Sequence, residues 1–151
     1  MTSVRDVWAV LAGVPDPEIP VLSVVDLGIV RSVAVEGKRA EVTLTPTYTG
    51  CPATLPIREA VEAALRERFD SVTVTVALAP AWTTEWITPL GRERLERFGI
   101  APPNPRENRP RACPHCGSEQ TEAISEFGST PCKALYRCRA CREPFDYFKC
   151  L

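Results

Sequence analysis

The chain has 151 residues, of which 44% are hydrophobic, and its formal net charge at pH 7 is −1. This length suits one ordinary domain or two small ones, and the near-neutral charge gives no field that would attract nucleic acid or a membrane surface. No segment approaches the roughly 20 consecutive apolar residues that cross a bilayer. Because the start of the chain has acidic Asp6 and no long apolar run, it does not resemble a signal peptide. We therefore expect a cytoplasmic protein that binds neither nucleic acid nor membrane.

A short amphipathic helix is the first element that the sequence predicts. Its apolar residues recur three and four positions apart, as on one face of a helix, and the pattern ends near Gly13. These residues are Val4, Val7, Trp8 and Leu11. The next segment, 14–20, contains three prolines, which exclude a helix and favour an extended loop.

Two strands joined by a tight turn are predicted next. In each strand, every second residue lies on the same face. Between the two strands, Glu36-Gly37-Lys38 is typical of a hairpin turn. The set of the first strand is Ile29, Arg31, Val33 and Val35, and that of the second strand is Ala40, Val42 and Leu44.

A helix and a third strand complete this half of the chain. The helix should begin at Pro52, because a proline at the first helical position lacks an N–H that would have no partner there. The inward residues of the helix are Ile57, Val61, Leu65 and Phe69. In the strand, Val72, Val74, Val76 and Leu78 alternate with Thr73, Thr75 and Ala77. A helix between two strands favours a crossover on one sheet face. We therefore predict an α+β fold, a small three-stranded sheet with packed helices.

Prolines mark the boundary between two predicted domains. After an aromatic loop and a charged helix over residues 91–98, a proline cluster begins at Pro102 and continues to Pro110. We predict an α+β domain at 1–101, a proline-rich linker at 102–110 and a zinc-ribbon-like metal-binding domain at 111–151.

Four cysteines near the C-terminus have the spacing of a metal site. They form two Cys-x-x-Cys pairs with 21 residues between them, and each pair can direct two sulfurs at one point from a single tight turn. These residues are Cys113, Cys116, Cys138 and Cys141. We predict that they bind zinc, with iron or an iron–sulfur cluster as the alternative for the same ligands. Disulfides or free thiols are the other interpretation of the pattern.

Three further cysteines lie outside the two pairs. Cys51 precedes Pro52 at the expected start of a helix, where the helix dipole would lower the thiol pKa and favour reactivity or metal binding. The alternative for Cys51 is a buried and inert side chain. Cys132 and Cys150 are interpreted either as a small buried residue and a tail residue, or as extra thiolates near the metal.

The chain lacks the usual groups of a self-sufficient enzyme. Its only histidine, His115, lies inside a cysteine pair, which argues against a Ser-His-Asp triad and against a di-iron site built on Glu-x-x-His motifs. The loop carboxylates have no predicted acid–base partner and would serve as caps and turn ligands. They are Asp16, Glu18, Asp26 and Glu85. We expect no catalytic activity from this chain by itself.

Several motifs resemble the metal–sulfur cluster biosynthetic domain family. They are Asp16-Pro-Glu-Ile-Pro20, Asp26-Leu-Gly-Ile-Val30 and Thr45-Pro-Thr-Tyr-Thr-Gly-Cys-Pro52. Later motifs narrow the resemblance to the family of D proteins of the bacterial phenylacetate degradation cluster. These are Trp82-Thr-Thr-Glu-Trp-Ile-Thr-Pro89, Glu126-Phe-Gly-Ser-Thr130 and Glu143-Pro-Phe-Asp-Tyr-Phe-Lys149. The resemblance covers essentially the whole chain.

This resemblance implies an accessory protein of phenylacetyl-CoA epoxidase, the multicomponent oxygenase that activates the aromatic ring. Such a protein would assist delivery of iron or an iron–sulfur cluster to the oxygenase and reductase components. The implied cluster-handling thiol is Cys51, with Cys132 as a further candidate, and the four paired cysteines would form the metal site. A homodimer is compatible with this interpretation.

Two alternative functions stay open. The chain could be an integral subunit of the oxygenase that takes part in electron transfer or assembly. It could also be a zinc-ribbon module for nucleic acid, because six arginines flank the cysteine pairs. They are Arg106, Arg109, Arg111, Arg137, Arg139 and Arg142. The weak overall charge argues against the second alternative.

Overall fold

The computed structural model describes residues 2–48 and 50–150. Contacts divide these residues into two compact units. The first comprises residues up to 82 together with 86–88, and the second comprises 83–85 and the residues from 89 onward. Within the described residues, no helix is long and apolar enough to cross a membrane.

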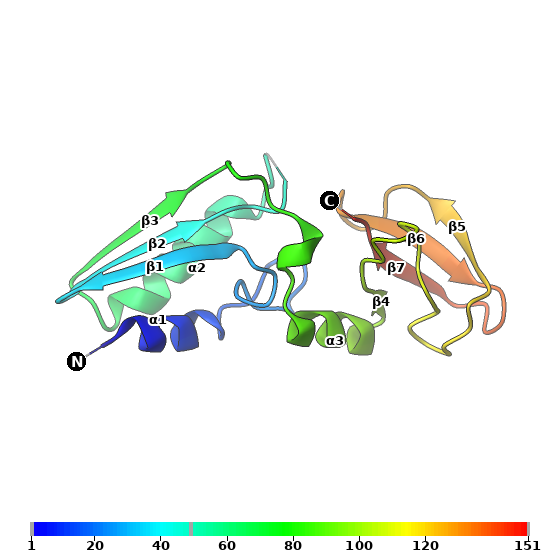
Figure 1. Cartoon of the computed structure of the whole chain (residues 1–151), viewed down its shortest axis with the longest axis horizontal. Helices are drawn as coiled ribbons and strands as arrows, with labels where there is room; N and C mark the ends of the chain where they lie inside the picture. Colours follow the sequence, from blue (N-terminus) through cyan, green and yellow to red (C-terminus); the bar gives the residue numbers. More distant parts are fainter. Residues whose placement is uncertain (1, 49, 151) are drawn as a thin grey trace. The chain divides into compact units, whose positions relative to one another are not determined.

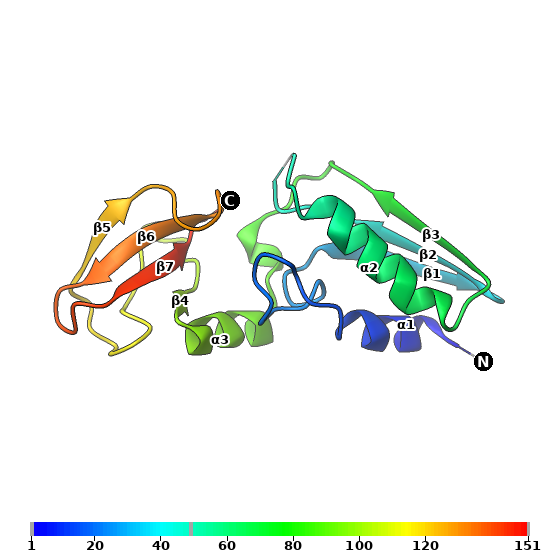
Figure 2. The same cartoon turned by 180° about the vertical axis from the view of Figure 1, so that it is seen from behind.

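The first unit is a three-stranded sheet with two helices (Figure 1). Its elements are α1 (Val4–Leu11), β1 (Val30–Glu36), β2 (Arg39–Leu44), α2 (Thr54–Arg66) and β3 (Ser71–Val76). The strand order is β1-β2-β3, with β1 antiparallel and β3 parallel to β2. Helix α1 contacts β1 and α2, and α2 contacts β3, so both helices cover one face of the sheet, as Figure 2 shows from behind. The predicted hairpin, crossover and α+β class are confirmed.

The core of this unit follows the sequence periodicities. One face of the strands and one stripe of each helix are buried, whereas the other sheet face presents mainly Ser, Thr and charged side chains. The buried residues from these elements include Val7, Leu11, Ala40, Val42, Leu44, Ile57, Val61, Leu65 and Val74. Burial of these faces is the main driving force for the packing of the helices on the sheet.

Two details of the first unit differ from the sequence prediction. The register of β1 and β2 shifts between Val30 and Ser32, and this irregularity places Arg31 on the surface instead of beside the buried residues. Helix α2 begins at Thr54 and not at Pro52, because the Thr54 N–H donates to the Cys51 carbonyl in a preceding turn. Phe69 lies beyond the end of α2 but is buried.

The second unit contains α3 (Pro89–Phe98) and a four-stranded sheet. The strands are β4 (Ile100–Ala101), β5 (Thr121–Ser125), β6 (Lys133–Cys138) and β7 (Pro144–Phe148), in the order β4-β7-β6-β5. Strand β4 is parallel to β7, and the other pairs are antiparallel. A short 3-10 helix, η1 (Thr84–Trp86), precedes α3. One buried cluster of this unit consists of Ala101, Cys113, Ala134, Cys138, Phe145 and Tyr147, and Leu95, Ile100, Cys132 and Phe148 are also buried.

Hydrogen bonds to Tyr147 tie the proline-rich segment 102–110 to the second sheet. The Tyr147 hydroxyl accepts from the Asn104 N–H at 3.0 Å and donates to Oδ1 of Asn108 at 3.3 Å. The chain passes from the first compact unit to the second between residues 82 and 89, whereas the sequence predicts the domain boundary at 102–110. That boundary remains a proposal about which segments fold independently.

Candidate metal centre and the Cys51 loop

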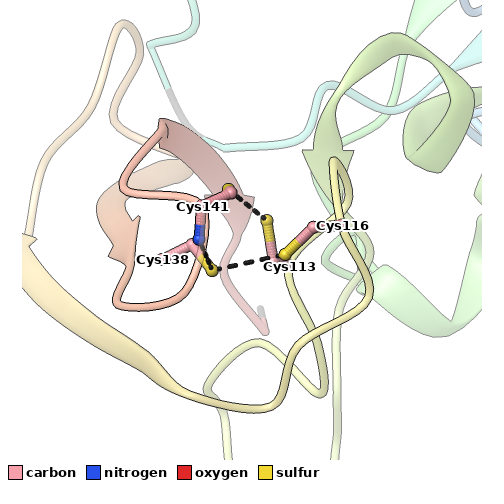
Figure 3. A group of neighbouring side chains, drawn as sticks. All are labelled: Cys113, Cys116, Cys138 and Cys141. Atoms are coloured by element: carbon pink, nitrogen blue, oxygen red, sulfur yellow. Dashed lines mark hydrogen bonds between the residues drawn. The ribbon is translucent and has the colours of Figure 1, made fainter.

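The four paired cysteines lie close together in the second unit. Their sulfur atoms are within 4.8 Å of one another, and Figure 3 shows the side chains converging from two turns. The Cys113 and Cys141 sulfurs are 3.8 Å apart, and the Cys116 and Cys138 sulfurs are 3.5 Å apart. All four are free thiols rather than disulfides. The structure therefore brings together the residues that the sequence spacing singled out.

Two turns closed by backbone hydrogen bonds position these thiols. In the first turn, the Gly117 N–H donates to the Cys113 carbonyl and the Cys113 N–H donates to the Ser118 carbonyl, both at 2.8 Å. The φ of Gly117 is +80°, a conformation that glycine adopts without steric cost. In the second turn, at the end of β6, the Cys138 N–H donates to the Glu143 carbonyl at 3.0 Å. Backbone hydrogen bonds thus define the turn of each Cys-x-x-Cys pair.

Backbone N–H groups also point at the sulfurs themselves. The His115 N–H donates to the Cys113 sulfur at 3.3 Å, and those of Ala140 and Cys141 donate to the Cys138 sulfur at 3.3 and 3.4 Å. The Cys141 N–H is the main cause that lowers the pKa of Cys138 to about 6; burial opposes it and the Ala140 N–H adds to it. One thiolate of the group is therefore formed near neutral pH.

The remaining thiols compete for their protons. The N–H of Glu143 acts to lower the pKa of Cys141, but burial and the neighbouring thiols together raise it to about 12. Crowded sulfurs cannot all ionise without a positive charge among them. A divalent cation would supply that charge and replace the protons, so the donor set suits metal binding.

The geometry fits a single tetrahedral ion. With zinc–sulfur bonds of about 2.3 Å, the sulfurs of a tetrahedron lie about 3.8 Å apart. The two separations of 3.8 and 3.5 Å agree with this spacing. Four thiolates would fill the coordination shell and leave no open position for a substrate. The arrangement therefore suits a structural ion.

The Cys51 loop belongs to the first unit and lies beside the loop of Glu18. The Cys51 sulfur donates to Oε1 of Glu18 at 3.5 Å, although the two residues are 33 positions apart. Asp16 shapes the Glu18 loop, because its Oδ2 accepts from the N–H groups of Glu18 and Ile19 at 2.9 and 2.8 Å. Thr49, within the motif at 45–52, lies outside the described residues. A thiol and a carboxylate from two loops thus meet at a half-buried position.

The expectation of a lowered Cys51 pKa is wrong. Burial is the largest cause and raises the pKa of the Cys51 thiol above its ordinary value of 9.0; the Ala53 N–H and the Tyr48 side chain act the other way, and the Glu18 charge raises it further. The N-cap of α2 is Ala53, two residues beyond Cys51. The start of the helix therefore does not determine the protonation of this thiol.

The other two cysteines of the second unit, Cys132 and Cys150, are not members of the four-cysteine group. Cys132 is buried, and its sulfur lies 3.0 Å from the Thr130 hydroxyl. The Cys150 sulfur lies 3.7 Å from the Tyr147 hydroxyl. His115 is exposed, with its ring edge-on to Phe145. Within residues 2–48 and 50–150, only the four paired cysteines form a group of three or more side chains with metal-ligand spacing.

Sequence reasoning missed the partner of Cys51. Glu18 was expected only to cap or support a turn, as Asp16 and Asp26 do: Asp26 accepts from the Ser23 N–H at 3.0 Å. No periodicity links Glu18 to Cys51, because their proximity depends on two irregular loops. The one available signal is that both residues lie in motifs of the same resemblance.

The comparisons with known proteins match the N-terminal and C-terminal parts of the chain to two different families. Residues 5–77 match the family described as iron–sulfur cluster assembly protein, and residues 102–149 match the PaaD zinc beta ribbon domain. The class defined by fold and site is thus an iron–sulfur cluster assembly domain followed by a zinc β-ribbon. The chain is 53% identical to the D component of the "Putative 1,2-phenylacetyl-CoA epoxidase" of Escherichia coli (strain K12), over 98% of this chain and 93% of that protein. It belongs to the family of phenylacetyl-CoA epoxidase D proteins.

Two solved structures resemble the first part of the chain. A domain of unknown function, DUF59, from Bacillus anthracis is 30% identical and has a TM-score of 0.57, over 61% of this chain and 90% of that chain. A conserved hypothetical protein from Thermotoga maritima is also 30% identical, with a TM-score of 0.54 over 62% of this chain and 94% of that chain. Both likenesses support the α+β fold of this part.

Proposed function

We propose that this chain is an accessory maturation protein of a multicomponent phenylacetyl-CoA epoxidase. In this role it assists the delivery of iron or an iron–sulfur cluster to the oxygenase and reductase components, and it catalyses no reaction by itself. The family membership and the match of residues 5–77 to iron–sulfur cluster assembly proteins support the proposal.

The contact between Cys51 and Glu18 is the observation that carries the proposal. A thiolate is a soft ligand and a carboxylate a hard one, and iron accepts both kinds. The Cys51 sulfur and the Glu18 carboxylate oxygen are 3.5 Å apart, so one ion could contact both. With only these two protein ligands the cargo would keep open positions, which is what transfer to another protein requires. Cys132 remains a second candidate thiol for this task.

The four-cysteine group has a different role in this proposal. Cys113, Cys116, Cys138 and Cys141 would hold a zinc ion that stabilises the second unit, because a sheet with so small a core gains much of its stability from the metal. Iron is the alternative occupant of the same ligands. Sulfurs within 4.8 Å of one another favour a single ion, since the ligands of a cluster must spread around several irons.

The decisive experiment separates loading from activity. The oxygenase and reductase components are produced in cells with and without this chain, and their iron and sulfide content is measured. We expect a component from cells without the chain to be deficient, and chemical loading with iron, or iron and sulfide, to restore its activity. Cys51→Ser should behave like absence of the chain, whereas Cys150→Ser, outside both sites, should support full loading. A fully loaded oxygenase that still needs the chain would overturn the maturation role.

An integral subunit is the second candidate, because the relative in Escherichia coli bears the name of a subunit. A stable stoichiometric complex, with activity lost when this chain alone is omitted, would favour it. A nucleic-acid module has less support. Arg137 and Arg139 form ion pairs with Glu122, and Arg109 forms one with Glu107. Three of the six flanking arginines are therefore already paired with two carboxylates, which offset two of their three positive charges.

A further inference from the structure

The four cysteines of the candidate metal centre differ sharply in exposure. Cys138 is 0% exposed and Cys113 is 2% exposed, whereas Cys141 is half-buried and Cys116 is exposed. Exposure controls which metal-bound thiolate an outside reagent can reach, since attack requires direct contact with the sulfur. Their burial by itself therefore shields Cys113 and Cys138 from an outside reagent.

Backbone hydrogen bonds reinforce the difference. The Cys113 sulfur accepts the His115 N–H and the Cys138 sulfur accepts the Ala140 N–H, both at 3.3 Å. A hydrogen bond to a thiolate draws on its lone pairs and so lowers the nucleophilicity of the sulfur. In the described part of the chain, no backbone N–H donates to the Cys116 sulfur, which lies 3.5 Å from the Cys138 sulfur. Cys116 is thus the most accessible of the four, and its sulfur lacks the backbone N–H donors that the sulfurs of Cys113 and Cys138 have.

The residues on either side of Cys116 leave it uncovered. The His115 ring is turned toward Phe145, with ring centroids 6.4 Å apart, and its Cε1 lies 3.0 Å from the position that a Cβ on Gly99 would occupy. Gly117 has no side chain, and a Cβ placed there would have no neighbour within 4 Å. The turn around Cys116 is therefore open to solvent.

We propose that Cys116 is the modification site through which soft electrophiles reach the ribbon, and that its modification releases the metal. The inference rests on the metal proposed for the four-cysteine group. With N-ethylmaleimide, the Cys116 sulfur forms a bond to one carbon of the ring double bond and the other carbon takes a proton from water, so no leaving group is needed. The resulting thioether carries no charge, and the metal loses one of its anionic ligands.

Mass spectrometry at short reaction times tests this assignment on the full, metal-bearing chain. Limiting N-ethylmaleimide is added, the adducts are located, and released metal is followed with a chromogenic chelator. Among the four paired cysteines, we expect Cys116 to be modified first and metal release to rise in step with its adduct. Cys150→Ser removes a half-buried thiol outside the group and should leave the rate of metal release unchanged.

The outcomes separate the two proposals. A metal-bearing chain in which Cys113, Cys138 or Cys141 is modified before Cys116 overturns the assignment, as does metal release that precedes any Cys116 adduct. Cys116→Ser adds an independent check, because in a variant that retains metal the fast phase of release should be lost. A purified chain that neither contains nor takes up zinc or iron overturns the proposed metal centre, and the release step with it.

Discussion

Gly28 lies so close to Trp86 that a Cβ atom at position 28 would be 2.3 Å from the Trp86 carbonyl oxygen and 2.7 Å from its Cβ. The Arg31 guanidinium also stacks over the Trp86 ring, at 3.5 Å from its centroid. The Thr88 N–H donates to the Asp26 carbonyl at 2.9 Å. The segment around Trp86 is therefore held against the start of β1, in one of the motifs that marked the family resemblance.

Replacement of Gly28 by alanine should destabilise the first unit strongly. The φ of Gly28 is +72°, and an L-residue in this region costs about 1–2 kcal/mol. The clash with Trp86 adds about 1–3 kcal/mol, typical of overpacking. Gly37→Ala is the matched control, because Gly37 has a φ of +59° and the position that its Cβ would occupy has no neighbour within 4 Å. Urea unfolding followed by tryptophan fluorescence measures both; equal losses of stability would contradict the close approach.

The Cys51 thiol should react slowly at neutral pH. Because burial raises its pKa above 9.0, the thiolate fraction at pH 7 is smaller than that of a free cysteine, and the alkylation rate should keep rising beyond pH 9. Glu18→Gln removes a negative charge that raises this pKa, so the pH profile should move to lower pH and the rate at pH 8 should increase. Mass spectrometry of the Cys51 peptide after timed alkylation measures both profiles.

Glu59→Gln provides the control for this charge change. Glu59 is an exposed residue of α2, and the same removal of one charge there should leave the Cys51 profile in place. If Glu18→Gln and Glu59→Gln gave identical profiles, the contact between Glu18 and Cys51 would have no influence on the thiol.

The Tyr147 hydroxyl should stabilise the second unit through the segment 102–110. Tyr147→Phe leaves the buried Asn104 N–H without its acceptor, which costs about 1–3 kcal/mol. Faster amide exchange in residues 104–108 and a lower unfolding midpoint are the expected results. Tyr136→Phe is the matched control. Tyr136 is a half-buried tyrosine of the same sheet, and its hydroxyl has no hydrogen bond to the described residues. A similar loss in both variants would argue against the Tyr147 network.

Metal removal should unfold the second unit and spare the first. Structural zinc contributes apparent binding free energies of about 10–16 kcal/mol in small zinc domains, and the core around Cys138 is small. All three tryptophans lie in the first unit, so their fluorescence should persist after chelation. Hydrogen exchange in β5, β6 and β7 should increase at the same time. Loss of the tryptophan signal together with those strands would show that the two units do not fold independently.

Local sequence patterns predicted much of the first unit. The alternation in β2 and β3 and the helical spacing in α1 and α2 gave the sheet, the crossover and the buried face, because each pattern repeats the period of its own backbone. The position of Arg31 was wrong, since a shift in strand register leaves no mark on such a period. The start of α2 was also wrong, because the turn at Cys51 competes with the first helical positions.

By itself, the sequence determined the fold class, the family resemblance and the grouping of Cys113, Cys116, Cys138 and Cys141, because a Cys-x-x-Cys pair encodes its turn within four residues. Only the tertiary structure decided which of these thiols is exposed, since exposure depends on what packs around the two turns. Only the tertiary structure placed Glu18 beside Cys51 and raised the thiol pKa. Desolvation and charge act through space between loops distant in the chain, and no short-range period records such distances.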